Sequence, residues 1–357
     1  MSQNLNPYSK SISILKEVLG EEKFKAIEQY LHSYDGTQES VRPVAKYITI
    51  YWLGRAADRM ILRTEGEDDI ILSQVGDESV PTIVFRKFKA VYLREYMKLL
   101  RVQWFKYGSL IRDEVYKDSK YNFLKDCSIS PGIAGEGKGA MHGRCMKCPV
   151  DVLMGATRAR VTYNLASRFV GDSAYALTAS FERRTGNSVD EISYTTIMIT
   201  GRESEEEKRT GGLFSETLVK PGTLFVGKIV LTMLSPVELL YILWLLHRVT
   251  RVGARTSIWG TLEVEPIAMV ADVFEVGTSY EAAEEMLREN DIAKAREKLL
   301  EYVKSVAFQT SSDIIELTKD TKEHIRSIDI LNKELVKELW NNAKNYIKGI
   351  EEYLKSK

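Results

Sequence analysis

The stretch that decides the fold runs from Pro221 to Val249 and reads PGTLFVGKIVLTMLSPVELLYILWLLHRV. Residues 223–234 carry few charges and predict a buried strand. Ser235 and Pro236 are typical of a helix start, with serine at the N-cap and proline at the first helical position. The apolar residues that follow have no polar face, which predicts a buried helix to Val249. Gly253 is then expected to end this helix.

Two further strands extend this pattern. Gly260 leads into residues 261–270, which predict a strand. A strand, a buried helix, a glycine-rich loop and a strand make up half of a ferredoxin-like sheet, the fold of RNA-recognition-motif domains. Residues 47–53 are rich in β-branched and aromatic side chains and predict another buried strand, closed by Gly54. We therefore expect an α+β fold with a ferredoxin-like, RRM-like core.

The two ends of the chain predict helices. Residues 10–34 carry apolar side chains at helical spacing, and Gly20 is expected to divide them into two short helices. From residue 279 onward, charges of both signs mix with apolar residues at helical spacing, which predicts a helical layer. A further helix is expected over residues 89–100, after strands that turn near Gly76.

Composition excludes several classes of protein. The 357 residues include 50 basic and 50 acidic side chains, so bulk attraction to nucleic acid or membrane is not expected. The longest uncharged apolar run, Leu239 to Leu246, is far shorter than the roughly 20 residues of a membrane helix. No signal peptide is visible, and three cysteines favour a reducing compartment over a disulfide framework. We expect a soluble, cytoplasmic protein with no membrane partner.

All three cysteines lie in one glycine-rich segment, residues 126–150, which has almost no large apolar side chain. The two-residue gap between Cys145 and Cys148 lets both thiolates reach one ion, and His142 and Cys127 add a third and a fourth ligand. The prediction is a closed, structural Zn²⁺ site that orders a segment without a core of its own. The alternative is a set of incidental thiols beside an exposed histidine.

The same segment nearly contains a phosphate-binding loop. Residues 132–139 have the glycine spacing and a lysine, but Gly139 stands where a serine or threonine would hold magnesium. No hydrophobic strand precedes them, so an ATPase is not expected. A redox role for Cys145 and Cys148 is disfavoured because a glycine-rich loop, and no strand, precedes them.

Charge is balanced overall but not locally. No acidic residue lies between Glu238 and Glu263, or between Asp151 and Asp172. Three basic clusters result, and they consist of His247, Arg248, Arg251 and Arg255; of Arg158, Arg160 and Arg168; and of Lys46, Arg55, Arg59 and Arg63. They could converge on a groove that follows a phosphate backbone, with Trp259 and Tyr51 available for base stacking. Ordinary solvated helix ends and salt bridges are the alternative.

Catalytic motifs are absent from the sequence, including His-Glu-x-x-His and Gly-x-Ser-x-Gly. His32 and His324 are expected at the surface, and His247 is expected to be a cation at a helix terminus. Acidic turns with Asp58, Asp68 and Asp69 could support a metal-dependent phosphodiester cleavage, although such turns are usually only solvated.

Several segments together resemble a known family. They are Leu213-Phe214, Val219–Phe225, Glu238–Leu243, Arg251–Ser257 and Gly260. Over residues 45–270 the chain is similar to the backbone subunit of type I-D CRISPR interference complexes, a RAMP protein with a modified RNA-recognition fold. The resemblance implies the following division: an N-terminal helical segment (1–44), a discontinuous RRM-like core (45–125 and 159–277) with a thumb hairpin (about 183–220), a zinc-binding insertion (126–158) and a C-terminal helical region (278–357).

The resemblance also implies a function without catalysis. Copies of the protein would polymerise along one CRISPR RNA, beside other subunits of the complex, and present its bases to target DNA. The RNA contacts implied by the family are Arg55, Arg59, Arg251, Arg255, Thr256 and Ser257, and Arg158 and Arg160 are added from charge alone. Trp259 could either stack on a base or pack in the core.

Two rival functions stay open at this stage. Related backbone subunits cut the target strand with a loop aspartate, a role that Asp58 or Asp69 could take here. The other rival is a zinc-containing RNA-binding protein that acts alone on cellular RNA.

Overall fold

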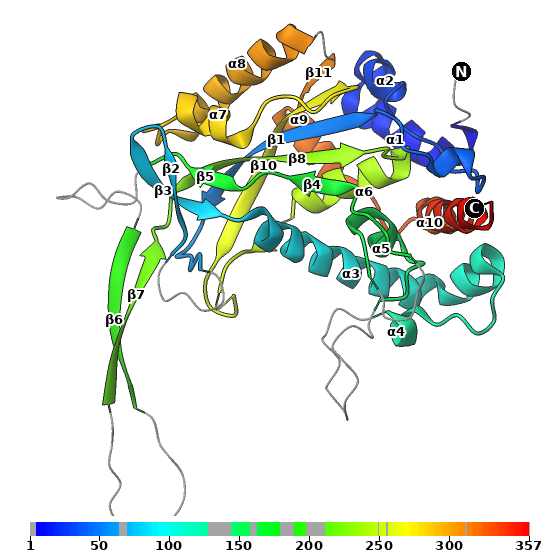
Figure 1. Cartoon of the computed structure of the whole chain (residues 1–357), viewed down its shortest axis with the longest axis horizontal. Helices are drawn as coiled ribbons and strands as arrows, with labels where there is room; N and C mark the ends of the chain where they lie inside the picture. The colour runs from blue at the N-terminus through cyan, green and yellow to red at the C-terminus, as the bar shows by residue number, and fades with distance from the viewer. Residues whose placement is uncertain are drawn as a thin grey trace, which may run out of the picture.

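The protein is described by a computed structural model that covers residues 5–63, 70–127, 144–157, 163–178, 189–197, 211–248, 250–254, 256–310 and 313–356. Within these residues the fold is α+β (Figure 1). One nine-stranded sheet has helices on both faces, and a two-stranded hairpin projects from it. Its strands lie in the order β11-β10-β1-β8-β5-β3-β2, with β4 paired to β8 and β9 paired to β10.

The centre of the sheet is β1 (Tyr47–Ala56). It pairs antiparallel with β8 (Leu224–Thr232) on one side and with β10 (Thr261–Asp272) on the other. The strand continues past Gly54, which does not close it as predicted. A Cβ at Gly54 would lie 2.9 Å from the Trp52 ring, so this glycine serves close packing inside the strand.

The two helices of the core lie between these strands in sequence. The long helix α3 (Phe85–Ser109) precedes the short strands β4 (Phe169–Gly171) and β5 (Ala174–Ala176), which both pair with β8. The buried helix α6 (Pro236–Leu246) joins β8 to β10. The order β-α-β-β-α-β, with β1 between β10 and β8, is the ferredoxin-like arrangement that the sequence predicts.

Helix α6 begins as its sequence predicts but ends earlier. The Ser235 hydroxyl accepts the backbone N–H of Glu238, whose carboxylate accepts the N–H of Ser235 in return, which is a capping box. The C-cap is His247. Gly253 belongs to the next loop and does not end the helix; its φ is +107°, and a Cβ there would lie 2.3 Å from the Ile61 carbonyl oxygen. The prediction for Gly253 was therefore wrong.

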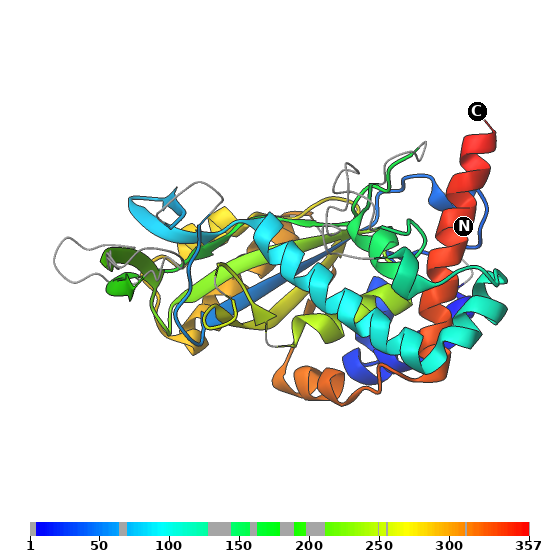
Figure 2. The ribbon, with the colours of Figure 1, turned by 90° about the horizontal axis from the view of Figure 1, so that it is seen from below.

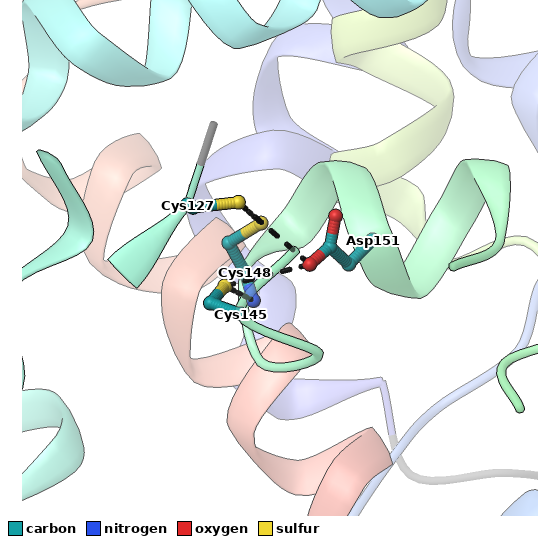
Figure 3. A group of neighbouring side chains, drawn as sticks. All are labelled: Cys127, Cys145, Cys148 and Asp151. Atoms are coloured by element: carbon teal, nitrogen blue, oxygen red, sulfur yellow. Dashed lines mark hydrogen bonds between the residues drawn. The ribbon is translucent and has the colours of Figure 1, made fainter. Parts of the chain in front are cut away.

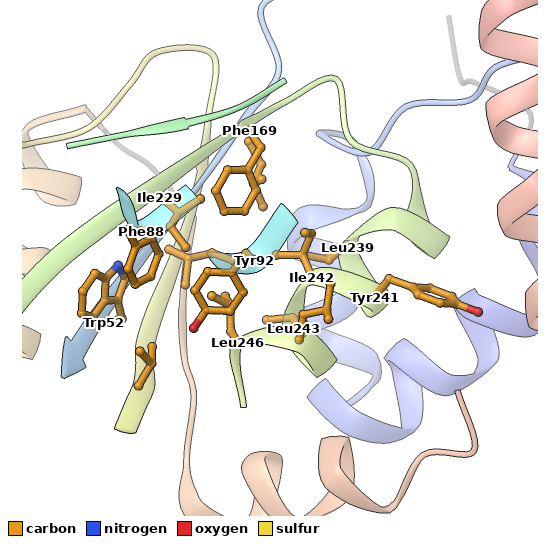
Figure 4. Close-up of a cluster of buried hydrophobic side chains, with 14 of the residues drawn as sticks. Trp52, Phe88, Tyr92, Phe169, Ile229, Leu239, Tyr241, Ile242, Leu243 and Leu246 are labelled. Atoms are coloured by element: carbon orange, nitrogen blue, oxygen red, sulfur yellow. The ribbon is translucent and has the colours of Figure 1, made fainter. Parts of the chain in front are cut away.

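The main core lies between the sheet and the helices α3 and α6 (Figure 4). The Trp52 ring of β1 stacks on Phe88 of α3, with centroids 4.5 Å apart. Aliphatic side chains of α6, among them Leu239, Ile242 and Leu246, fill the same layer (Figure 4). Neighbouring Tyr51 lies on the opposite face of the sheet.

The opposite face is covered as well. Helices α7 (Ser279–Glu285) and α8 (Ile292–Thr310) lie over it, and β11 (Asp313–Glu316) extends the sheet beside β10 (Figure 1). Tyr51 is fully buried there: its hydroxyl donates to the Val276 carbonyl (2.5 Å), and its ring contacts Tyr302 of α8. It cannot stack on a base, and this part of the prediction was wrong.

The remaining helices and strands complete the fold. They are η1 (Asn6–Tyr8), α1 (Ser9–Leu19), α2 (Glu21–Glu28), η2 (Glu39–Val41), β2 (Leu72–Val75), β3 (Glu78–Ile83), the π-helix η3 (Leu110–Tyr116), α4 (Phe123–Asp126), α5 (Pro149–Met154), β6 (Val189–Ile197), β7 (Gly211–Val219), β9 (Thr250–Arg251), α9 (Lys319–Ser327) and α10 (Lys333–Lys355). The break at Gly20 and the turn at Gly76 agree with the sequence predictions. None of the helices described is long and apolar enough to cross a membrane.

Candidate metal centre and nucleic-acid interface

The three cysteines come together in space (Figure 3). Cys127 follows α4, whereas Cys145 and Cys148 lie just before α5. Their Sγ atoms and a carboxylate oxygen of Asp151 all lie within 4.8 Å of one another, and all four residues are buried. Cys127 is far away in sequence, yet it belongs to this cluster. His142, the fourth predicted ligand, lies outside the described residues.

A tight turn brings the two later cysteines to the same side. Met146 has a φ of +60°, which reverses the chain between Cys145 and Cys148. The Cys148 N–H then donates to the Cys145 Sγ at 3.3 Å. Pro149 starts α5, and its first turn carries Asp151 back toward the sulfurs. The two-residue spacing thus places both thiols toward one point, as metal sites of this type require.

The distances fit a tetrahedral ion. The Sγ atoms of Cys127 and Cys148 are 3.6 Å apart, and the Cys145 Sγ is 3.5 Å from Asp151 Oδ2. With a Zn–S bond of about 2.3 Å, a tetrahedron places its sulfurs about 3.8 Å apart. The sulfurs are free thiols. The donor set of three soft sulfurs and a harder fourth group suits Zn²⁺.

Asp151 is the residue that the sequence analysis missed. Its Oδ2 accepts the Met146 N–H (2.8 Å), and its Oδ1 accepts the Nε–H of Arg144 (2.6 Å). Burial raises the pKa of Asp151 to about 7, with a further increase from Cys145, while Arg144 opposes both effects. The available signal was its position three residues after Cys148, about one helical turn away.

The environment also shifts the pKa of each thiol. Burial raises the pKa of Cys145, but the hydrogen bonds of the other two thiols and of the Lys147 and Cys148 backbone together outweigh burial and hold that pKa well below the usual value. Burial, together with hydrogen bonds to the other two thiols, keeps the pKa of Cys148 high. A bound divalent cation would supply the positive charge that lets all three thiolates share one buried site.

The second candidate site is where three segments meet at one end of the core. After β1 the chain pairs with the base of the hairpin, since Met60 and Val219 exchange two backbone hydrogen bonds. On its other side, the Ala254 N–H donates to the Ile61 carbonyl oxygen (2.9 Å), and the Gly260 N–H donates to the Arg59 carbonyl oxygen (2.8 Å). The loop after β1 therefore lies between the β6-β7 hairpin and the loop of residues 250–260.

Asp58 fastens this junction. Its Oδ1 accepts the N–H groups of Gly260 (2.8 Å) and Thr261 (2.7 Å), and its Oδ2 accepts the Thr261 hydroxyl (2.7 Å). The carboxylate thus holds the start of β10 against the end of β1, which is a positioning role. Asp68 and Asp69 lie outside the described residues.

The predicted RNA contacts lie partly at this junction. Arg59, Arg251 and Ser257 are exposed, and Arg251 donates to the Thr256 carbonyl (3.1 Å). Arg55 is exposed and pairs with Glu263 across the sheet (2.7 Å). Trp259 is only half-buried. The structure does not describe Arg158, Arg160 and Arg255.

Several other predicted positions are wrong. Arg168 is buried against Glu238, so it cannot line a nucleic-acid groove. Lys46 lies just before β1, at the other end of the strand from Arg55, and its ammonium donates to the Leu31 carbonyl (2.6 Å). His32 is buried with its Nε2 2.7 Å from the Ser40 carbonyl oxygen. His247 is also buried, and burial lowers its pKa to about 4, so it is no cation at neutral pH. His324 is exposed, as predicted.

Comparison with known proteins identifies the family. The sequence model of the Csc2 CRISPR family matches residues 30–356. The chain belongs to this family. Csc2 from Thermofilum pendens, known from a crystal structure, superposes with a TM-score of 0.64 at 21% identity, over 96% of this chain and 98% of that one. The Csc2 fold is therefore shared along nearly the whole of both chains.

More distant structural similarity extends to two chains of CRISPR RNA-guided surveillance complexes, one of them in a pre-nicking state. Both are 10% identical to this chain, with TM-scores of 0.45 and 0.44; they cover 75% and 76% of it, and 90% and 87% of their own lengths are matched. A search of curated proteins gave no match.

Proposed function

We propose that this Csc2-family protein is the CRISPR RNA-binding backbone subunit of a type I-D antiviral interference complex. Copies of it polymerise along the guide RNA, next to other subunits, and present the RNA for pairing with target DNA. Membership in the Csc2 CRISPR family supports the first part of this proposal. The junction of the β1 end, the 250–260 loop and the hairpin base supports the RNA contact.

The junction has the chemistry of a backbone-binding surface. Exposed Arg59 and Arg251 come from two segments that are joined by backbone hydrogen bonds, so the backbone fixes the positions of these two residues relative to each other. Arginine can pair with phosphate without reading a base, which leaves base edges free for pairing. The proposed RNA contacts are Arg55, Arg59, Arg158, Arg160, Arg251, Arg255, Thr256 and Ser257. The β6-β7 hairpin takes the part of the thumb.

The proposed role is structural and not enzymatic. All the hydrogen bonds of the Asp58 carboxylate described above go to Gly260 and Thr261. We therefore propose that this aspartate positions the loop and does not take part in cleavage. For the same reason we assign no catalytic residue.

The proposed metal is a structural Zn²⁺ held by Cys127, Cys145 and Cys148, with either His142 or Asp151 as the fourth ligand. The metal would tie α4 to the start of α5 and thereby close the base of the insertion, residues 126–158. The remaining division proposed is the helical segment 1–44, the core of 45–125 and 159–277, and the helical region 278–357, which also contributes β11 to the sheet.

The test combines assembly with RNA binding. The protein is co-expressed with a CRISPR array, and native mass spectrometry and sequencing identify the bound RNA. Several protomers on one uniform guide RNA are expected. Monomers with heterogeneous cellular RNA would contradict the backbone role and support a stand-alone RNA-binding protein.

The RNA surface has its own test. Arg251→Ala should weaken binding to all RNA sequences equally and reduce the salt slope by about one. Lys319→Ala is the matched control, because Lys319 is an exposed cation on α9. Equal effects of the two variants would contradict the assignment of the junction.

A further inference from the structure

The outer face of α3 is an unusual surface in a chain without net charge. The helix carries seven basic residues against one acidic residue, Glu95. Arg94, Lys98, Arg101, Val102 and Phe105 share one helical face and are all exposed, and this set is called the basic face below. Phe105 is 77% exposed, the largest value among the exposed hydrophobic side chains described. Figure 2 shows α3 across the front of the molecule.

The basic face has few partners among the described residues of its own chain. Lys98 pairs with Glu95 (2.6 Å), but Arg94 and Arg101 form no ion pair with any residue that the structure describes. An exposed phenylalanine beside unpaired arginines is typical of a surface that another molecule covers.

A surface of opposite character lies on the other side of the sheet. Residues 275–291, which include α7, hold six acidic residues against one basic residue, Arg288. Phe274, Tyr280, Glu281, Glu284 and Glu285 are exposed there and are called the acidic face below. Phe274 is 67% exposed, and Glu284 and Glu285 form no ion pair within the described part of the chain.

The two faces point away from each other. Adjacent residues of β1 show this directly, because Trp52 packs on Phe88 of α3 while Tyr51 donates to Val276, next to the acidic face. Figure 1 shows α7 and α3 on opposite sides of the sheet. One copy of the chain therefore cannot bring its own two faces into contact.

We infer that the basic face of α3 docks onto the acidic face of a second copy of this chain. The two surfaces are opposite in charge, and each includes an exposed phenylalanine: Phe105 on α3 itself, and Phe274 five residues before α7 in the sequence. A contact between two different faces is heterologous, and repeating it gives an open chain of subunits instead of a closed dimer. This inference rests on the proposed polymerisation along RNA and names the residues that join successive copies.

The test uses two charge-reversed proteins. One carries Arg94→Glu and Arg101→Glu, and the other carries Glu284→Arg and Glu285→Arg. Assembly is measured as protomers per guide RNA by native mass spectrometry. Each variant alone should assemble about tenfold or more weakly than wild type, because like charges then face each other at the contact.

Mixing the two variants is the decisive step. In the mixture, the α3 made acidic in one protein can dock onto the face made basic in the other. The unchanged α3 of the second protein can dock onto the unchanged acidic face of the first. Alternating filaments should therefore form at the wild-type level. Lys23→Glu with Lys25→Glu, a matched pair of exposed residues on α2, should assemble as wild type without mixing.

Binding to an RNA too short for two copies separates this inference from the proposed function. Both variants should bind that RNA as wild type does, which also shows that they are folded. Weaker binding by the α3 variant would make α3 a nucleic-acid surface and overturn the inference. Wild-type assembly by either variant alone, or no recovery in the mixture, would also overturn it. If the wild type itself binds no RNA, the proposed function fails instead.

Discussion

Arg168 and Glu238 form an ion pair inside the core, with side chains that are 6% and 1% exposed. The guanidinium also lies over the rings of Tyr34 and Tyr346, 5.1 Å and 4.9 Å from their centroids, and donates to the Met233 carbonyl (2.9 Å). Tyr34 precedes β1 and Tyr346 belongs to α10. One arginine therefore joins the N-terminal segment, the core and the C-terminal helix.

Removing one partner of this pair should destabilise the whole fold. Arg168→Met leaves the Glu238 carboxylate buried without its cation, and the free energy of unfolding should fall by about 3–5 kcal/mol. Arg55→Ala, which breaks the exposed pair with Glu263, is the control and should cost no more than about 1 kcal/mol. Chemical denaturation measures both. A small effect at Arg168 would mean that Glu238 finds water or another partner.

The proposed metal ligands can be tested one residue at a time. Cys145→Ser should reduce bound zinc and make the chain near α5 more accessible to protease, because the sulfur cluster loses a member. His142→Ala and Asp151→Ala then identify the fourth ligand, since only the true ligand should lower metal content as much as a cysteine does. Metal content is measured by elemental mass spectrometry on the purified protein. Unchanged zinc in Cys145→Ser would rule out this cluster as the metal site.

The sequence predicted the ferredoxin-like core because its signals are local. The capping box at Ser235 and the apolar run of α6 act within a few residues, and tertiary contacts agree with them. The misplaced residues depend on distant partners instead. Arg168 reads as a surface cation until Glu238, seventy residues away, is seen beside it.

The candidate metal site shows the same limit. The spacing of Cys145 and Cys148 is a local signal, and it points to one shared ion. Asp151 joins them only because Met146 turns the chain and α5 carries the carboxylate back. The helices that bury the other face of the sheet could not be predicted either, because no residue near Tyr51 in the sequence indicates its contact with Tyr302.

Asp58 should act on RNA binding through the 250–260 loop. Asp58→Ala removes the acceptor for two backbone N–H groups and one hydroxyl, so the loop should loosen and RNA affinity should fall. Asp58→Asn keeps one carbonyl oxygen and should retain most of the affinity. Hydrogen exchange at the Gly260 and Thr261 amides should rise in the alanine variant. Normal exchange with lost affinity would instead place Asp58 in direct contact with RNA or a metal.

His247 should make stability depend on pH. Its pKa is lowered to about 4 by burial, whereas in the unfolded chain it returns to about 6.5. Between these values the unfolded state binds more protons, so stability should be complete above about pH 6.5 and fall as the pH decreases toward 4. The loss attributable to this histidine should reach at most about 3 kcal/mol.

The pH effect is measured as a difference between variants. His247→Gln cannot take up the proton, so its free energy of unfolding should vary less between pH 6.5 and 4 than that of wild type. His324→Gln, at an exposed histidine, should leave the slope as it is in wild type. Burial also lowers the pKa of His32, which adds a second contribution of the same sign that both variants retain. Equal slopes in wild type and His247→Gln would show that folding does not lower the pKa of His247, and would contradict this prediction.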